Sequence, residues 1–458
     1  MGAARAASVR RRPVAALILF FFAEQTSAES VSFDEVLVPP GKSLQPLYLF
    51  YVHSQNDSLN DRRGPPAVKF NLGLRKIHEN IPGSTAGHQG LEAILLPYKE
   101  LLTLVETSHA CGFEGSAEGA AGGVVRHEIT SSHLQEEVNL LVDSGIYALL
   151  FANCGKDTSN FKVTGTVSMR NSHGFLSAID YPKKNFYCLF AVLYSVSAMM
   201  WVHRALQWQA QGPYIFKGIA LISIVGVAEC TSWWLLYYRW NTSNEYSDSL
   251  FLIAALFTVC KVMLSFRLVL ISTMSIEHLQ LKDKGDRRGD YLKVDAVLLL
   301  YMVCTVSEMS VLAFRHSRAV QLEFVMMNVA PSVAVACALF ALCHQALAGV
   351  IAPLAIKRHD AQVAVFVRSQ AILNVAMLGG FVVTMLQVFD PTAGENVQYW
   401  WLHWFCSDGA FQLVSFATLC AAMHTWLPHA RQGTNNSQVP RGAEKVIGAP
   451  SAVCWDFE

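Results

Sequence analysis

Seven long apolar segments constrain the fold of this chain more than any other feature. They are residues 186–202, 214–238, 250–276, 294–314, 324–348, 363–389 and 399–427. Each is long enough for a helix that crosses the hydrocarbon core of a bilayer. Because lipid offers no hydrogen-bond partner to free backbone groups, each segment must form a helix. The sequence therefore predicts an α-helical seven-transmembrane bundle over residues 183–427.

The first residues have the pattern of a secretory signal peptide. Arg5 and Arg10 precede an apolar run over residues 13–23, and the small side chain of Ala28 suits a cleavage site. The apolar run is shorter than the ~20 residues that a spanning helix needs, which argues against an uncleaved anchor. We predict a signal peptide over residues 1–28 and a mature chain that starts in the lumen.

Residues 29–182 have the composition of a soluble domain, large enough for a core of its own. Three stretches in it have strand character: residues 45–53, 145–154 and 162–170. In the third, Val163, Val167 and Met169 alternate with polar residues and share one face. Such strands pack as an all-β sandwich, which we predict for this luminal domain.

Cysteines and sequons add to the picture of a luminal domain. Cys111 and Cys154 are the two cysteines of this domain, and in an oxidising compartment they allow one disulfide. Asn56 and Asn241 lie in glycosylation acceptor patterns that the predicted topology places in the lumen. Asn435 lies in the same pattern but on the cytosolic side, so we expect no glycan there.

An odd number of spans puts the two ends of the chain on opposite sides of the membrane. With a luminal start, the C-terminal tail, residues 428–458, is cytosolic, and we expect it to be disordered. The segments that then face the cytosol carry more Lys and Arg than the luminal ones, as the positive-inside rule requires.

Ionisable side chains inside the spans are the candidate site. Insertion of a charge at mid-bilayer costs at least ~2.5 kcal/mol, so each such residue needs a reason. They are Glu229, Lys261, Arg267, Glu308 and Asp408. One interpretation is a polar cavity open to the lumen, with Glu229 paired to Lys261 across consecutive helices at matched depth. Asp408 and Glu308 would supply negative potential there for a cation or a lipid amine. The other interpretation is a closed bundle in which each charge is satisfied by a neighbour and fixes helix packing.

Four features of the sequence belong together: HGFLSAIDYPKKNFY (173–187) before the first span, Trp201 and Trp208 around the first cytosolic loop, WFCSDGAFQLV (404–414) in the last span and TWLPHARQGTNN (425–436) after it. In these features the chain resembles the lung seven-transmembrane receptor family, also called the GOLD-domain seven-helix proteins. The chain departs from the family pattern at Phe411 and Leu427, where the family has Trp and Arg. It resembles a divergent member.

The resemblance implies a luminal GOLD-like β-sandwich similar to domains of cargo-binding trafficking proteins. It also implies residence in Golgi and linked endosomal membranes, multi-pass, with roles in trafficking between them. Some family members are proposed to be receptors or cation channels, so the resemblance defines the architecture better than the activity.

Other classes fit the residues poorly. A rhodopsin-like receptor would carry Asp-Arg-Tyr after its third span and Asn-Pro-x-x-Tyr in its seventh, and neither occurs. A zinc hydrolase would need His344, His403, His424 or Asp408 to converge, and the predicted depths separate them. A formal net charge of zero without long basic blocks gives no reason to expect a nucleic-acid partner. We expect no enzyme activity, no metal and no cofactor.

The leading hypothesis is a Golgi or endosomal protein that sorts or retrieves cargo. Its luminal domain would bind a protein or lipid of unknown identity, and the charged loop over residues 282–293 would meet the trafficking machinery. The alternative is a cation channel, transporter or lipid-binding receptor that uses Glu229, Lys261, Glu308 and Asp408.

Overall fold

The computed structural model divides the chain into two compact units. The first comprises Met1–Lys184, Leu235–Asp248 and Thr392–Trp404, and the second comprises Asn185–Trp234, Ser249–Pro391 and Phe405–Glu458. The residues that the structure describes are 30–38, 45–52, 64–77, 91–97, 100, 125–129, 133–139, 143–154, 160–207, 214–281, 287–315, 322–356, 360–389 and 401–435.

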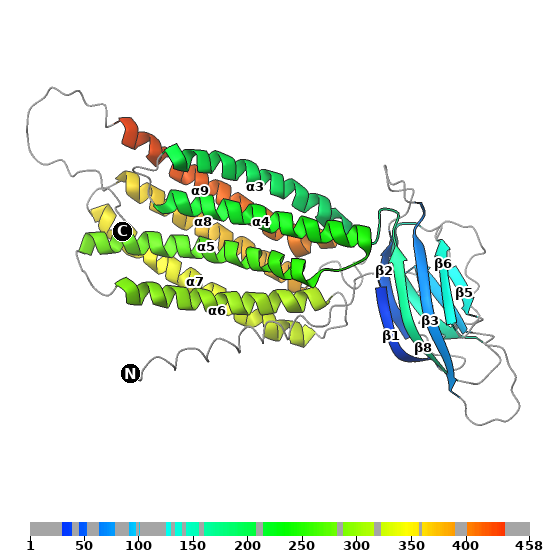
Figure 1. Cartoon of the computed structure of the whole chain (residues 1–458). Coiled ribbons are helices and arrows are strands. Elements are labelled where there is room, and N and C mark those ends of the chain that lie inside the picture. The colour runs from blue at the N-terminus through cyan, green and yellow to red at the C-terminus, as the bar shows by residue number, and fades with distance from the viewer. Residues whose placement is uncertain are drawn as a thin grey trace, which may run out of the picture. The chain divides into compact units, whose positions relative to one another are not determined.

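In the described part of the first unit, eight strands form two four-stranded antiparallel sheets (Figure 1). The strands are β1 (Ser30–Val38), β2 (Gln45–Val52), β3 (Ala67–Ile77), β4 (Leu91–Pro97), β5 (Val125–Ile129), β6 (His133–Asn139), β7 (Gly145–Asn153) and β8 (Asn160–Arg170). One sheet has the order β1-β8-β3-β6 and the other β2-β7-β4-β5. The predicted all-β domain is confirmed, and the three predicted strand stretches are β2, β7 and β8.

The core of this domain is formed by alternate residues of both sheets. From one sheet, β8 contributes Val163, Val167 and Met169, the three residues predicted to share a face, and all three are fully buried. From the other, β7 contributes Leu149 and Phe151 to the same hydrophobic cluster. The strand periodicity of two therefore sets which side chains meet between the sheets.

Seven helices follow within the described residues, one for each predicted apolar segment. They are α3 (Tyr181–Gln207), α4 (Tyr214–Ser243), α5 (Asp248–Leu281), α6 (Arg287–Arg315), α7 (Leu322–Ile356), α8 (Asp360–Phe389) and α9 (Ala410–Asn435), with a π-helical turn η3 (Phe405–Gly409) before α9. Five of the described helices, α3, α4, α5, α7 and α8, are long and apolar enough to cross a membrane, and α6 contains a shorter apolar stretch, Val294–Ser307.

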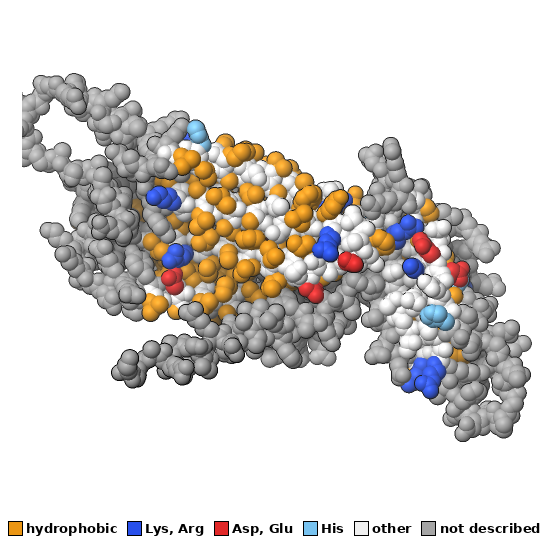
Figure 2. Space-filling view, in the orientation of Figure 1, with side chains coloured by type: hydrophobic (Ala, Val, Ile, Leu, Met, Phe, Trp, Pro, Cys, Tyr) orange, Lys and Arg blue, Asp and Glu red, His pale blue; other side chains and the backbone are white. Residues whose placement is uncertain are grey.

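The surface of the helices is apolar where soluble proteins are polar. Figure 2 shows hydrophobic side chains spread over the helical surface, with charged side chains gathered toward the helix ends. Exposed residues on these helices include Met199, Leu256, Val375 and Phe381. A helix surface of this kind suits contact with lipid, in agreement with the predicted fold class.

The predicted domain boundaries stay predictions, and the helical end of the chain differs from the expectation at one point. Helix α9 continues to Asn435, so the first residues of the tail 428–458 are helical and not disordered. The predicted signal peptide, Cys111, Asn56 and the rest of the tail lie outside the described residues. Cys154 lies within the described residues, and its disulfide with Cys111 stays a prediction.

Candidate functional site

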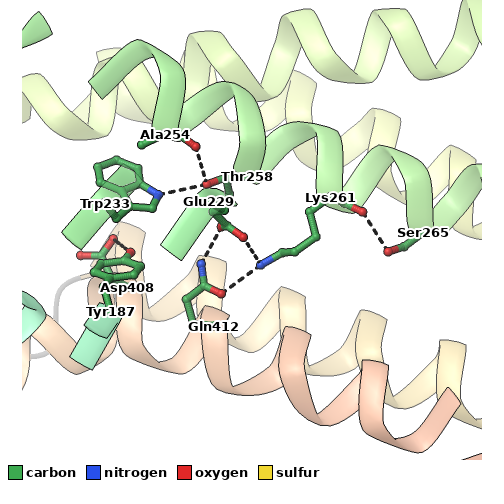
Figure 3. Close-up of polar contacts among 9 residues, drawn as sticks. All are labelled: Tyr187, Glu229, Trp233, Ala254, Thr258, Lys261, Ser265, Asp408 and Gln412. Atoms are coloured by element: carbon green, nitrogen blue, oxygen red, sulfur yellow. Dashed lines mark hydrogen bonds and ion pairs between the residues drawn. The ribbon is translucent and has the colours of Figure 1, made fainter. Parts of the chain in front are cut away.

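Glu229, Lys261 and Gln412 are buried in the helical unit, and Figure 3 shows their side chains pointing toward one another. They come from α4, α5 and α9. The Lys261 ammonium lies 2.5 Å from Glu229 Oε2 and donates to Gln412 Oε1 at 2.9 Å. Gln412 Nε2 in turn donates to Glu229 Oε1 at 2.6 Å. Each residue contacts the other two, so the Glu229–Lys261–Gln412 cluster joins three helices by a closed ring of polar contacts.

The cluster is closed to solvent. The side chains of Glu229 and Lys261 are 0% and 4% exposed, and Gln412 is buried as well. The Lys261 ammonium also lies 5.3 Å from the centre of the Tyr194 ring and 5.7 Å from that of Phe411. Two opposite charges with an amide between them are neutral as a group, and the flanking rings add cation–π attraction. This arrangement compensates the loss of water around both charges.

Local sequence places these side chains on facing surfaces. Gly226 lies three residues before Glu229 on the same face of α4, and a Cβ there would lie 2.5 Å from the Tyr194 ring. The glycine therefore lets α3 approach α4 closely beside the charged pair. One turn toward the end of α4, Trp233 Nε1 donates to Thr258 Oγ1 of α5 at 3.1 Å and ties α4 to α5, the two helices of the Glu229–Lys261 pair.

Gln412 was not among the residues singled out from the sequence. The predicted Glu229–Lys261 contact is present, but only ionisable side chains were weighed as candidates, and an amide costs less to bury than a charge. The sequence did contain one indication that Gln412 belongs to the site. Gln412 follows Asp408 by four residues and so falls one helical turn further along the same helix face. Phe411, noted only as a departure from the family pattern, contacts the Lys261 ammonium.

Asp408 lies apart from the cluster. It belongs to the π-helical turn η3, where it is partly buried, and Tyr187 of α3 donates a long hydrogen bond of 3.5 Å to its Oδ1. Figure 3 shows this pair beside the cluster and separate from the Lys261 ammonium. π-Helical turns inserted before α-helices are frequent at functional positions.

Arg267 pairs with a residue outside the Glu229–Lys261–Gln412 cluster, and its assignment to a shared polar cavity stays a prediction. Its Nε donates to Asp295 Oδ1 of α6 at 3.0 Å, and the two side chains are 36% and 48% exposed. Asp295 lies at the start of the fourth apolar segment and was not singled out. Glu308 lies on α6, but its side chain is outside the described residues. Among the described side chains, Arg267 and Asp408 thus contact residues outside the Glu229–Lys261–Gln412 cluster.

A second polar cluster lies in the first unit, where residues Asn171–Tyr181 connect β8 to α3. Asn241, near the end of α4, is 4% exposed, and its Nδ2 donates to the His173 carbonyl at 2.9 Å. Its Oδ1 accepts from the Leu176 amide at 3.2 Å. Glycosylation would modify this same Nδ2, so the folded structure argues against a glycan at Asn241.

Among the described residues, no group of three or more His, Cys, Asp or Glu is placed to hold a metal ion. His344 on α7 forms a hydrogen bond of 2.8 Å with Gln370 on α8. This contact links two helices and involves no second histidine.

The sequence of helices and the interior ion pair are those of a multi-pass membrane protein. Residues 182–433 match the family model described as GOST, seven transmembrane domain. That match covers more than half of the chain, and the chain therefore belongs to the GOST seven-transmembrane family, as the resemblance to lung seven-transmembrane receptors predicted. It is similar to Transmembrane protein 87A of Xenopus tropicalis, with 28% identity over 131 residues. The match covers 28% of this chain and about a quarter, 24%, of that relative.

Proposed function

We propose that this protein takes part in membrane trafficking, where it sorts or retrieves cargo through its N-terminal β-sandwich. The protein would reside in Golgi membranes and in linked endosomal and secretory-pathway membranes. Its sandwich would lie in the lumen and its C-terminus in the cytosol. In this role it is a binding protein and not an enzyme, and the ligand of the sandwich is a luminal protein or lipid.

The observation that carries this proposal is the closure of the Glu229–Lys261–Gln412 cluster. A conducting or transporting cavity needs charges that face a water-filled path. Glu229 and Lys261 instead face each other and are shielded from solvent. Of the two interpretations of the charged residues in the helices, this geometry favours the one in which they fix helix packing.

The surface of the N-terminal β-sandwich also supports the proposal. The outer face of the sheet β1-β8-β3-β6 is polar, with Lys69 and Asn71 of β3 and Thr166 of β8 exposed, while the residues between them are buried in the core. A folded domain with a broad polar sheet face suits the binding of a partner. Family membership and the similarity to Transmembrane protein 87A are consistent with a membrane protein of this design.

The test is rescue of cells that lack the protein. Three forms are compared: one without residues 29–170, one with the basic residues of the loop 282–293 replaced by Gln or Asn, and one with the charge-free pair Glu229→Gln and Lys261→Met. Sorting predicts that the first two fail to restore the distribution and secretion of luminal cargo, and that the charge-free pair restores both. The opposite pattern would overturn the proposal. Surface or Golgi staining of each form controls for correct delivery.

Cation conduction is the second candidate, and Asp408 is the observation that favours it. This carboxylate lies in a π-helical turn at the start of the last helix, partly exposed and outside the closed cluster. Purified protein in a planar bilayer tests the idea, with Asp408→Asn alongside. A cation current that the substitution reduces would support conduction. No current from folded protein over a range of voltage would reject it.

A further inference from the structure

Lys217, in the first turn of α4, projects from the outer surface of the helical unit, and its two neighbours in the chain fix its direction. Phe216 faces α3, where its ring stacks on Trp201 at 5.5 Å between centres and its carbonyl accepts from Trp201 Nε1 at 3.1 Å. Gly218 faces α5, since a Cβ there would collide with Leu268. Successive residues of an α-helix point about 100° apart, so Lys217 points outward between these two contacts, and it is exposed.

Basic side chains flank Lys217 on both neighbouring helices. Arg204 belongs to the last turn of α3, at the end of that helix that contacts the start of α4. On α5, Arg267 immediately precedes Leu268, the residue that meets Gly218. Arg204 is exposed and Arg267 is partly exposed. Figure 2 shows basic side chains of this kind among hydrophobic ones near the ends of the helices. Three positive charges therefore lie across three consecutive helices.

The acidic side chains described around these residues do not neutralise all three charges. Asp295 of α6 pairs with Arg267 at 3.0 Å. Within the part of the chain that the structure describes, neither Lys217 nor Arg204 forms an ion pair. This surface therefore carries a net positive charge, and an anion from outside the chain complements it.

The face of α4 that continues from Lys217 is apolar. Leu221 and Ile224 follow Lys217 by four and seven residues and so share its helix face, and they are 47% and 49% exposed. At ~1.5 Å per residue, this apolar face extends about 10 Å along the helix from the lysine. Free phosphate would contact only the basic side chains. A phospholipid matches both features, with its phosphate at the basic residues and its acyl chains along Leu221 and Ile224.

We propose that Lys217 binds the phosphate of an anionic phospholipid, with Arg204 and Arg267 adding positive charge on either side. The acyl chains of this lipid lie along Leu221 and Ile224 on the outer face of α4. In the orientation proposed above, this end of the helices faces the cytosol, and the cytosolic leaflet carries anionic lipids. The site is separate from the cargo binding proposed for the sandwich and does not depend on it.

Native mass spectrometry of the full-length protein tests the site, with phosphatidylglycerol and phosphatidylcholine as the two probes. Wild type should bind the first phosphatidylglycerol more tightly than phosphatidylcholine. Lys217→Gln should weaken phosphatidylglycerol binding about fivefold, which is the effect of one basic residue near a membrane surface, and leave phosphatidylcholine binding unchanged. Lys217→Arg keeps the charge and should retain the preference.

Arg239→Gln is the matched control for Lys217→Gln. Arg239 is an exposed basic residue near the other end of α4, where it pairs with Glu245 at 3.5 Å. Its replacement should leave the affinity for phosphatidylglycerol at the wild-type value. Equal affinities of Lys217→Gln and Arg239→Gln for this lipid would overturn the proposal.

Two further outcomes of the same measurement separate the lipid from other occupants. Inorganic phosphate should not displace phosphatidylglycerol at equal concentration, because it has no acyl chains to contact Leu221 and Ile224. Displacement at equal concentration would assign the site to free phosphate and overturn the proposal. A dimer that carries no lipid would also overturn it, because a second copy of the chain would then cover this face.

Discussion

The side chain of Asn241 closes a hydrogen-bonded ring with the main chain of the segment that begins at His173. Its Nδ2 donates to the His173 carbonyl at 2.9 Å, and its Oδ1 accepts from the Leu176 amide at 3.2 Å. The main-chain carbonyl of Asn241 accepts from the Phe175 amide at 3.2 Å. One asparagine thus satisfies three main-chain groups of the connection between β8 and α3, and this explains why a sequon residue is buried.

Replacement of Asn241 by Ala should destabilise the protein by about 1–3 kcal/mol, because a buried carbonyl and a buried amide lose their partners. Ser243→Ala is the matched control. It removes the same glycosylation sequon and changes only an exposed hydroxyl that donates to the Arg239 carbonyl. The melting temperature of purified protein checks both variants.

The same pair of variants tests for a glycan. The measured quantity is the shift in electrophoretic mobility that enzymatic deglycosylation produces. We expect this shift to be the same in wild type and in both variants. A shift lost equally in Asn241→Ala and Ser243→Ala would show that the sequon is modified, and the buried position of Asn241 would then need another explanation.

Gly174→Ala should be among the most damaging single substitutions in the connection. Gly174 has φ +137°, and a Cβ there would collide with the carbonyl and side chain of Asn241. Gly64→Ala is the control, since Gly64 also has positive φ, +92°, but has no atom near the added Cβ. Both variants incur backbone strain of about 1–3 kcal/mol, and only Gly174→Ala adds the collision. Equal melting temperatures for the two variants would contradict the described geometry.

The parts of the fold that could be predicted are those fixed by long apolar patterns. Bilayer thickness sets the length of the seven segments, and a strand period of two sets the buried face of Val163, Val167 and Met169. The Glu229–Lys261 contact was also predictable, because two buried opposite charges at similar depth on consecutive helices need each other.

The rest of the candidate site could not be predicted, because it depends on which faces of the helices converge. No local sequence pattern indicates which faces do so. Gln412 carries no charge, so nothing required a partner for it, although it is the residue that completes the cluster. The sequence did not indicate the pairing of Arg267 with Asp295, because Asp295 lies near a segment end, where a charge needs no explanation. A sequon likewise carries no information about burial, and Asn241 illustrates this.

Tyr147 should make the stability of the β-sandwich sensitive to high pH. Burial on β7, followed by the nearby charge of Asp143, raises the pKa of the Tyr147 phenol from its ordinary value near 10 to about 12, and the hydroxyl donates to the Asp143 carbonyl at 3.0 Å. Because the folded state holds the proton more tightly than the unfolded state, this contribution is complete below pH 10. It is lost as the pH rises from about 10 to about 12.

Tyr147→Phe isolates that contribution. It removes the hydrogen bond, so the variant is less stable than wild type at neutral pH, but it also removes the titrating group. Melting temperatures measured from about pH 9 to about pH 11 should therefore fall more steeply for wild type than for the variant. The difference in phenolate absorbance between the two proteins should titrate well above pH 10. Parallel melting curves together with an ordinary titration would show that the phenol is not protected.

The buried ion pair should behave as a unit in a double-mutant cycle. Glu229→Gln alone leaves the Lys261 ammonium buried without its counter-charge, and Lys261→Met alone leaves the Glu229 carboxylate in the same state. Each single substitution should lower the free energy of unfolding by about 3–5 kcal/mol. Removal of both charges together should lower it by far less than the sum of the two. Thermal unfolding of the detergent-solubilised protein, monitored by its monodisperse fraction, measures all three variants.

The Arg267–Asp295 pair is the matched control for that cycle. It joins α5 to α6 at 3.0 Å, but both side chains are partly exposed, so water screens the charges. Arg267→Gln should therefore cost no more than about 1 kcal/mol, and its coupling to Asp295→Asn should be small. If Glu229 and Lys261 showed an equally small coupling, the charges would be solvated in the native protein. The closed cluster would then be wrong, and the argument against a conducting cavity would lose its basis.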